Sequence, residues 1–318
     1  MSRTDQTMSA PALEQFAGKG LARAARRRAI RRGELAPIRG TSFGADRRPG
    51  WVTYTILMVI FVLSCFPVYY AILLASSDGA TIAANPLPSL LPQGNLWENL
   101  GRVMSSDVNF WRALTNSVII SVVTAISVMF FSTLAGFAFS KLRFRGSKPL
   151  LLFVIGTMAV PAQLGVVPLF IVMAELKWIG ELQAVIVPGL ASAFGVFWMT
   201  QYLQSALPFE LVEAARVDGC SMIRTFWHVA VPSARPAMVM LGMFTFVSSW
   251  TSFFWPFIVL GSKNPTLPVA LTLLQGTYFK DYSLIMAGVV ITTVPLMILF
   301  VLAGRHLVTG VMQGAIKG

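Results

Sequence analysis

The sequence is poor in charge. Asp, Glu, Lys and Arg make up 12% of its 318 residues, about half the fraction that soluble domains usually carry. Hydrophobic residues account for 55%, and the mean hydropathy is +0.69. The low charge argues against a soluble enzyme, and the high hydrophobicity excludes a disordered chain. A polytopic membrane protein is the class that remains.

Cysteine and histidine are also scarce, with two of each. Two cysteines cannot form a disulfide framework or a four-cysteine metal site, and two histidines give little support to zinc or haem chemistry. Cys65 falls in an apolar run and Cys220 in a more polar segment, so we expect them not to pair. The sequence therefore predicts no metal site.

Six stretches without a charged residue are long enough to cross a bilayer, which takes roughly 20 apolar residues in a helix. The stretch 79–97 is too rich in proline and polar residues, and 264–279 is too short to cross, although it could dip into the membrane. We therefore predict an all-α fold with a basic tail at 1–50 and a transmembrane domain at 51–318. The six membrane-spanning helices are predicted near 51–75, 113–140, 150–174, 183–205, 236–260 and 284–303.

The basic residues are distributed unevenly. Eleven of the 25 lie in residues 1–50, before the first predicted span. With six spans, the side of the membrane that holds this tail carries 20 basic residues in all and the opposite side carries 5. The positive-inside rule then places both termini in the cytoplasm. A basic tail beside anionic lipid also accounts for the net charge of +12 without nucleic acid as a partner.

The six predicted helices contain no Asp, Glu, Lys, Arg or His. Ion-coupled pumps usually place such groups inside the membrane, so a proton-coupled carrier is disfavoured. A sodium-coupled secondary carrier remains an alternative because backbone carbonyls and hydroxyls can bind sodium. Hydrolytic or transferase chemistry would need a base or a metal site. The sequence offers neither, so we do not expect an enzyme.

The second predicted span carries a stripe of small and polar side chains. Gaps of three, four and their multiples place them on one helical face. Small residues allow two helix backbones to approach closely, so we expect this face to pack against neighbouring helices rather than bind substrate. The stripe consists of Ser117, Ser121, Thr124, Ser132, Ala135 and Gly136.

The segment 206–235 is the only long loop on the predicted cytoplasmic side. Its pattern predicts a helix, a turn and a second helix. Gly219 can adopt the left-handed conformation that ends a helix, and Asp218 or Ser221 could cap the next one. Pro232 and Pro236 are expected to end this second helix before the fifth span begins.

Two interpretations of this loop follow from its physical chemistry. A short helix with a ridge of small residues and apolar flanks fits a groove on another protein. An amphipathic helix of this length could equally lie on the membrane surface. Composition and spacing leave both open.

The loop resembles the "EAA" loop of ABC-importer permeases. The resemblance rests on Glu213-Ala214-Ala215, Asp218-Gly219, Phe226 and Pro232, in this spacing after a fourth span. Three further runs are similar to carbohydrate-importer permeases of the maltose-permease G-subunit type, and the resemblance covers roughly residues 50–318. These runs are MAVPAQLGVVPLF (158–170), FTFVSSWTSFFWPFIVL (244–260) and HLVTGVMQGAIKG (306–318).

The resemblance implies a permease subunit of the bacterial inner membrane. It implies that a cytoplasmic ATPase dimer docks on the loop, that a second homologous permease completes a heterodimeric pathway, and that an extracytoplasmic sugar-binding protein delivers substrate. The sequence has no G-x-x-x-x-G-K-[ST] phosphate loop, so ATP and Mg are expected on the ATPase and no cofactor on this chain. The coupling residues implied are Glu213, Ala214, Ala215, Asp218, Gly219, Phe226 and Pro232.

The resemblance further implies a di- or oligosaccharide as substrate. Such ligands need largely apolar walls with a few well-placed polar groups. Each aromatic candidate could instead pack against lipid or a neighbouring helix. At Thr251 and Ser252 the family often has an Asn and an acidic residue, so its contacts are not carried over there. The candidate pathway residues are Asn116, Gln163, Trp250, Thr251, Ser252 and Trp255.

Overall fold

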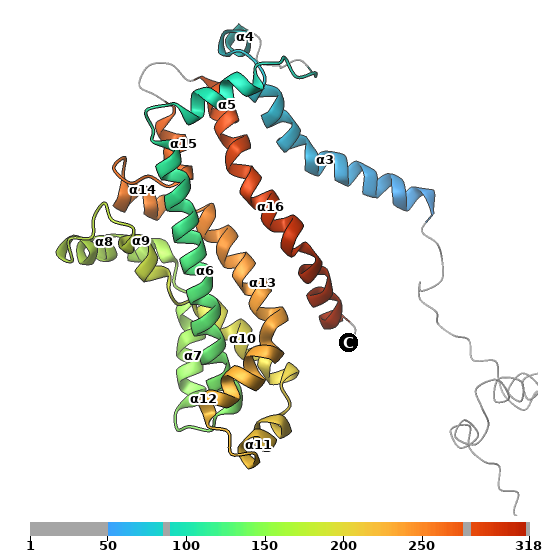
Figure 1. The fold of residues 1–318 in the computed structure, drawn as a ribbon, viewed down its shortest axis with the longest axis vertical. Helices are drawn as coiled ribbons and strands as arrows, with labels where there is room; N and C mark the ends of the chain where they lie inside the picture. The colour runs from blue at the N-terminus through green and yellow to red at the C-terminus, as the bar shows by residue number, and fades with distance from the viewer. Residues whose placement is uncertain (1–49, 85–89, 276–280, 316–318) are drawn as a thin grey trace, which may run out of the picture. The chain divides into compact units, whose positions relative to one another are not determined.

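A computed structural model describes residues 50–84, 90–275 and 281–315 (Figure 1). The chain divides into two units, residues 1–63 and 64–318. The predicted basic tail lies outside the described residues, apart from Gly50. In the first unit the described part is the beginning of helix α3, Trp51–Ala75. All regular structure in the described ranges is helical.

The described residues contain five helical runs that are long and apolar enough to cross a membrane, and a bent pair of helices supplies a sixth. This confirms the predicted all-α polytopic fold. The runs are Trp51–Ala75, Phe110–Lys141, Gln183–Ala206, Met222–Trp250 and Tyr282–Leu302, and the bent pair is Ser147–Thr157 with Ala162–Glu175.

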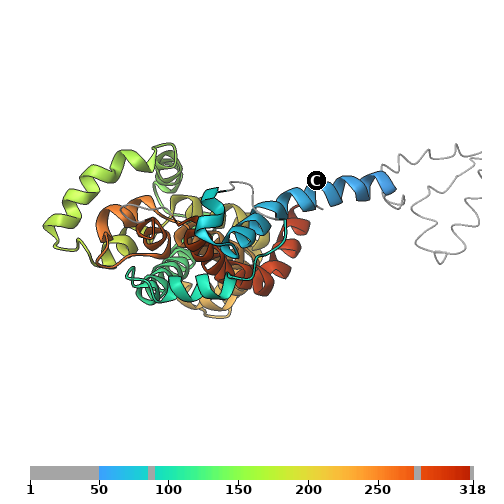
Figure 2. The same cartoon turned by 90° about the horizontal axis from the view of Figure 1, so that it is seen from above.

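The third span is not the single helix predicted at 150–174. It consists of α7, Ser147–Thr157, and of η1 with α8, Ala162–Glu175, which are bent by 88° relative to one another. Pro161 lies at the break, and it has no backbone N–H with which to continue the hydrogen-bond ladder of α7. As a result α8 runs away from the helix bundle (Figure 2).

The fourth span is interrupted as well. Helix α9, Gln183–Ile186, passes into the short η2, Val187–Gly189, and helix α10, Ala193–Ala206, begins after a break. Pro188 lies within η2. Ser192 caps α10, because its hydroxyl accepts a hydrogen bond of 3.2 Å from the backbone N–H of Gly195.

The fifth span differs most from its prediction at 236–260. A continuous helical run extends from Met222 to Trp250, and a separate helix α14, Phe254–Leu260, follows it. Pro232 and Pro236 therefore do not end the second helix of the loop. The run begins with α12, Met222–Thr225, widens into the π-helical turn η3, Phe226–Ala230, and continues as α13, Val231–Trp250.

The wide turn explains how the helix passes its prolines. Pro232 lacks the N–H that would bond to the preceding turn, and π-helical turns arise where the regular ladder is interrupted. The hydroxyl of Ser233 supplies a hydrogen bond of 2.8 Å to the carbonyl of Val229. Because the helical run starts earlier than predicted, it includes two arginines, Arg224 and Arg235.

The remaining elements lie at the end of the second unit that is opposite to α11, Phe209–Val217. They are α4, Gly79–Ala84, α5, Leu96–Met104, and α15, Leu267–Leu273, which falls in the stretch predicted to be too short to cross. The last helix, α16, runs from Tyr282 to Ala315 and is longer than predicted.

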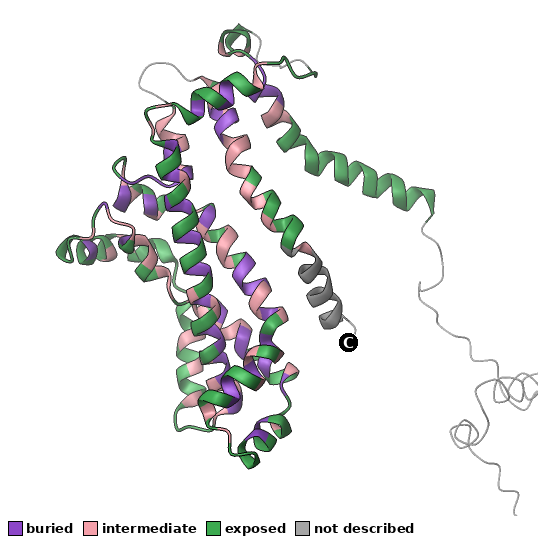
Figure 3. Cartoon of the chain, in the orientation of Figure 1, coloured by how far each residue is buried: buried purple, intermediate pink, exposed green. Residues whose placement is uncertain are grey.

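Helix α6, Phe110–Lys141, is the central element of the second unit and packs mainly against α10 and α13. The predicted stripe of small residues makes these contacts. A Cβ placed on Gly136 would lie 2.7 Å from Cβ of Met199, and a Cβ placed on Gly195 would overlap the hydroxyl of Ser132. This confirms the packing role predicted for Ser132 and Gly136, whereas Thr124 of the same stripe lines a cavity described below. Figure 3 shows the resulting bands of buried residues along α6 and α13.

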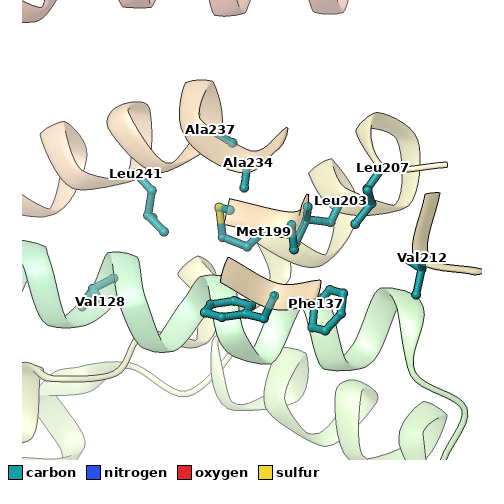
Figure 4. Close-up of a cluster of buried hydrophobic side chains, with 11 residues drawn as sticks. Val128, Phe137, Met199, Leu203, Leu207, Val212, Ala234, Ala237 and Leu241 are labelled. Carbon is teal, nitrogen blue, oxygen red and sulfur yellow. The ribbon is translucent and has the colours of Figure 1, made fainter. Parts of the chain in front are cut away.

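Two hydrophobic clusters occupy the two ends of this bundle. One joins α6, α10, α11 and α13 through residues such as Phe137, Leu203 and Val212 (Figure 4). The other joins the end of α3 to α5, α6, α13, α15 and α16, with Trp250 among its buried members. The loop predicted to act in coupling is thus built onto a packed core.

Candidate functional site

The predicted loop forms a tight helix-turn-helix. Two hydrogen bonds close the end of α11: Gly219 N–H donates to the Arg216 carbonyl at 3.0 Å, and Cys220 N–H donates to the Ala215 carbonyl at 2.8 Å. Together they make a Schellman motif, which requires a left-handed residue at the position of Gly219. Its φ is +77°. The prediction that Gly219 ends the helix is confirmed.

The next helix is capped by Ser221, one of the two candidates. Its hydroxyl accepts a hydrogen bond of 3.4 Å from the backbone N–H of Arg224. Asp218 instead occupies the C-terminal cap of α11. Only three residues therefore separate α11 from the N-cap of α12, so the turn holds the two helices in a defined relationship.

The surface of α11 has a distinct face. Glu213, Ala214, Asp218 and Gly219 are exposed there, and nothing lies within 4 Å of the position that a Cβ on Gly219 would occupy. Small residues that are exposed in this way leave the backbone open to close approach by another protein. These four predicted coupling residues lie together on the free side of the turn.

The other three predicted coupling residues lie elsewhere. Ala215 faces inward beside the buried Val212. Phe226 is only 4% exposed and belongs to the hydrophobic cluster under α11. Pro232 is exposed but lies ten residues beyond the start of α12, about 15 Å along the helix. Ala215 and Phe226 are buried beneath the exposed face of α11, and Pro232 is not part of that face.

Two apolar residues on α11 escaped the sequence analysis. Leu211 and Val217 are exposed, Val217 to 87%. Their spacing from Ala214 is three residues in each direction, which places all three on one side of the helix. We define the docking face as Leu211, Glu213, Ala214, Val217, Asp218 and Gly219. An apolar residue three positions on either side of an exposed alanine was the available signal in the sequence.

A second site is a cavity of about 580 Å³ within the bundle. It lies where three interrupted spans meet α6: η1 and α8, the break between η2 and α10, and the end of α13 with α14. Backbone breaks at membrane depth are tolerated where they line a cavity. Its polar lining consists of hydroxyls, contributed by Thr124, Ser192, Thr245, Ser248, Ser249 and Ser252.

The cavity also has aromatic and apolar walls, including Phe244 and Trp255. The indole N–H of Trp255 donates a hydrogen bond of 3.0 Å to the carbonyl of Ala184, which fixes the plane of the ring. None of the described residues that line the cavity is charged. Hydroxyls with an anchored aromatic face suit an uncharged, hydroxyl-rich solute.

Two of the six predicted pathway residues, Ser252 and Trp255, line this cavity. Gln163 lies beside it, exposed on η1 next to the lining residue Ala162. Thr251 is at the end of α13, where its hydroxyl donates to the carbonyl of Val247 at 2.8 Å. Its hydroxyl is thus engaged within its own helix.

The remaining two predicted pathway residues serve packing. Trp250 is 3% exposed, and its indole N–H donates to the Thr292 carbonyl at 3.1 Å, joining α13 to α16. The amide of Asn116 donates to the Pro265 carbonyl at 3.0 Å, joining α6 to the segment before α15. The sequence analysis missed the hydroxyls of α13 that line the cavity, which belong to Thr245, Ser248 and Ser249.

In the described residues, no three His, Cys, Asp or Glu side chains gather into a group that could hold a metal ion. The docking face offers a protein surface, and the cavity offers a space for a solute.

Comparison with known proteins decides between the two functions considered above, an ABC-importer permease and a sodium-coupled secondary carrier. Residues 130–312 match the family described as the inner membrane component of binding-protein-dependent transport systems. The chain belongs to this family. The matched residues include almost all of both sites. Only Ile120, Thr124 and Val128 of α6, which line the cavity, precede residue 130.

Curated relatives agree with this assignment. The chain is 30% identical over 270 residues to the arabinooligosaccharides transport system permease protein AraQ of Halalkalibacterium halodurans, covering 84% of this chain and 96% of the relative. It is 30% identical to the trehalose/maltose transport system permease protein MalG of Thermococcus litoralis, covering 83% and 94%. It is 28% identical to the sn-glycerol-3-phosphate transport system permease protein UgpE of Escherichia coli O157:H7, covering 84% and 98%.

A solved structure shares the fold. The crystal structure of a bacterial ABC transporter involved in the import of the acidic polysaccharide alginate matches with a TM-score of 0.68 and 23% identity, over 80% of this chain and 94% of that one. The family assignment confirms the importer hypothesis over a sodium-coupled carrier acting alone. It makes the chain a multi-pass inner-membrane transport component that works with an ATPase and a binding protein.

Proposed function

We propose that this permease subunit carries a neutral di- or oligosaccharide. The observation that supports this most directly is the cavity, whose polar lining is made of hydroxyls and whose described lining residues carry no charge. A phosphorylated or acidic substrate would need cationic partners in a site that excludes water. Among the relatives, the names that mention arabinooligosaccharides and trehalose or maltose fit this lining better than the name that mentions sn-glycerol-3-phosphate.

The chain forms half of a translocation pathway. The cavity is bordered by this chain on the side of α6, α13 and the break before α10, and a second homologous permease would border the remaining side. An ATPase dimer that binds ATP and Mg then docks on the two permeases from the cytoplasm. Both termini of this chain lie on that side, because the predicted loop charges favour it.

Coupling runs through the docking face of α11. Exposed small and apolar residues at Leu211, Ala214 and Val217 fit a groove on the ATPase, and the turn at Gly219 allows its backbone to approach. Closure of the ATPase dimer would displace α11 and, through the core behind it, the helices that line the cavity. Alternating access to the cavity follows from such a displacement.

Purification of the tagged chain from its native host in mild detergent tests this function. Mass spectrometry is expected to find an ATPase with a phosphate loop and a second six-span permease. Gly219→Asp and Glu213→Lys should release the ATPase and retain the second permease. Wild-type complex in liposomes, with the binding protein from the same operon, should take up labelled maltose or arabinotriose only with ATP.

Two results would contradict the proposal. One is a chain that purifies alone and takes up either sugar without ATP. The other is a complex that transports sn-glycerol-3-phosphate and neither neutral sugar, which would keep the ATP-driven importer but reject the substrate class.

A further inference from the structure

The last residue of α6 reaches the elbow between α10 and α11. Lys141 is only 9% exposed. Its Nζ donates a hydrogen bond of 3.5 Å to the carbonyl of Gln204, which lies in the last turn of α10. Carbonyls in a last helical turn lack partners within the helix and attract cations. Lys141 thereby ties the end of α6 to the end of α10.

The same ammonium group also acts on the start of α11. Burial disfavours the charged ammonium, and the carboxylate of Glu210, in the first turn of α11, offsets this only in part by electrostatic attraction. The two groups do not form a close ion pair among the described residues, where the two ion pairs found join other residues. Burying a cation without a close counter-ion is costly. A buried lysine at this point is therefore unexpected if its role were packing alone.

A second cation, Arg143, lies two residues beyond the end of α6 and contacts α11 at its first residue. The guanidinium carbon of Arg143 lies 5.4 Å from the ring centroid of Phe209, within the range of a cation–π interaction. Lys141 and Arg143 thus contact Gln204 and Phe209, which lie on either side of the elbow at Leu207-Pro208.

The elbow rests on the hydrophobic cluster shown in Figure 4. Leu207 and Val212 are fully buried there, close to Phe137 of α6. Apolar contacts of this kind are not directional, so they fix the orientation of α11 less strictly than hydrogen bonds and ionic contacts do. The two cations add directional contacts at the edge of the cluster. From Lys141, α6 continues for about 25 Å to Thr124 in the cavity wall.

We propose that Lys141, assisted by Arg143, is a positioning residue that fixes the docking helix α11 to α6, so that a displacement of α11 carries the cavity wall at Thr124 with it. This inference rests on the proposed function, because the displacement originates in the ATPase. Loss of the contact would leave an assembled complex in which α11 pivots about the elbow and ATP hydrolysis is no longer transmitted to the cavity.

Spin labels on α11 and α6 test the contact without knowledge of the substrate. Arg216 on α11 and Ile126 on α6 are both exposed and lie outside the docking face. With Cys65 and Cys220 replaced by serine, cysteines at these two positions carry the labels. Pulsed electron paramagnetic resonance then measures the distance between α11 and α6 in the purified complex, without nucleotide and after trapping with ATP and vanadate.

A narrow distance distribution that is the same in both states is expected for the wild type. Lys141→Met should broaden it even without nucleotide, so this readout does not depend on the ATPase. Lys141→Arg should restore the narrow distribution, and Lys148→Met, which removes an exposed lysine near the same loop, should leave it unchanged. Glu210→Gln, an exposed substitution that does not threaten folding, should broaden it partially.

The functional readout is the amount of sugar transported per ATP. Lys141→Met is expected to retain the ATPase on purification and to lower this ratio roughly fivefold or more, a range typical of coupling between sites. A distribution as narrow in Lys141→Met and Glu210→Gln as in the wild type would overturn the proposal. So would a wild-type distance that changes between the two states. Absence of an ATPase from the wild-type complex would instead refute the proposed function.

Discussion

Arg102 and Asp281 form an ion pair of 2.9 Å between Nη2 and Oδ2, although 179 positions separate them in the sequence. Arg102 also donates to the side-chain oxygen of Asn99, whose amide donates in turn to the carbonyls of Ala75 and Ser77. This network joins the end of α3, helix α5 and the start of α16. It fixes the end of the bundle opposite to the docking face.

Asp281 is expected to contribute to stability chiefly as a helix cap. Its carboxylate accepts hydrogen bonds from the backbone N–H groups of Ser283 and Leu284 at the start of α16. Asp281→Ala should therefore cost roughly 1 kcal/mol and lower the melting temperature in detergent. Arg102→Met should cost less, because ion pairs this exposed contribute little. Asp107→Ala, an exposed acidic residue on the same side, serves as the control. Equal melting temperatures for Asp281→Ala and Asp107→Ala would contradict the assignment.

The contribution of Asp281 to the stability of the folded protein should depend on pH. Burial by itself raises the pKa of this carboxyl, but hydrogen bonds from Ser283, Leu284 and Arg102, together with the charge of Arg102, outweigh it and hold the pKa below its ordinary value of 3.8. A lowered pKa in the folded state means that the stabilisation is present above 3.8 and is lost as the pH falls through the lowered value. The difference in melting temperature between wild type and Asp281→Asn should therefore stay constant near neutral pH and shrink only in acid. A difference that vanishes between pH 6 and 7 would argue against this origin.

Close packing between α6 and α10 predicts a severe effect of a small substitution. A Cβ on Gly136 would lie 2.7 Å from Cβ of Met199 and 2.9 Å from the backbone nitrogen of Thr200. Backbone cannot move aside cheaply, so Gly136→Ala should destabilise the protein by about 1–3 kcal/mol. Gly156→Ala is the control, because nothing lies within 4 Å of that position. Thermal unfolding of the two variants in the same detergent measures the difference, and equal stabilities would contradict the packing described here.

Filling the cavity should block transport without disturbing assembly. Ser248 lines the cavity from α13, and Ser248→Trp would occupy part of its 580 Å³. Uptake of labelled maltose or arabinotriose should fall by at least roughly tenfold, corresponding to about 1.4 kcal/mol, while the ATPase still co-purifies. Thr55→Trp replaces an exposed hydroxyl of α3 and should transport normally. Undiminished uptake by Ser248→Trp would remove this cavity from the pathway.

Much of the architecture could be predicted from the sequence because membrane spans and helix ends have local causes. Charge-free apolar runs located the spans, and Gly219 marked the end of α11 because a left-handed residue was needed there. Ser132 and Gly136 of the stripe on α6 were correctly assigned to packing, since the small residues shared one helical face, but Thr124 lines the cavity. Each of these features depends on residues that are close together in the sequence.

The errors arose where tertiary context determines the outcome. Pro232 and Pro236 suggested a helix end, but a π-helical turn and the Ser233 hydroxyl carry the helix past them. Trp250 suggested a substrate contact, but its indole is satisfied by Thr292 of α16, a helix distant in the sequence. The hydroxyls at Ser248 and Ser249 were overlooked because only the meeting of three broken spans makes them a cavity wall.

The most direct test of coupling through α11 is site-specific photo-crosslinking in cells. A photoreactive amino acid replaces Val217, which is 87% exposed at the centre of the docking face, and in a control replaces Leu90, which is 79% exposed at the opposite end. The account predicts that position 217, and not position 90, crosslinks to an ATPase that contains a phosphate loop. Crosslinks from position 217 to lipid alone, or to the ATPase equally from position 90, would contradict it.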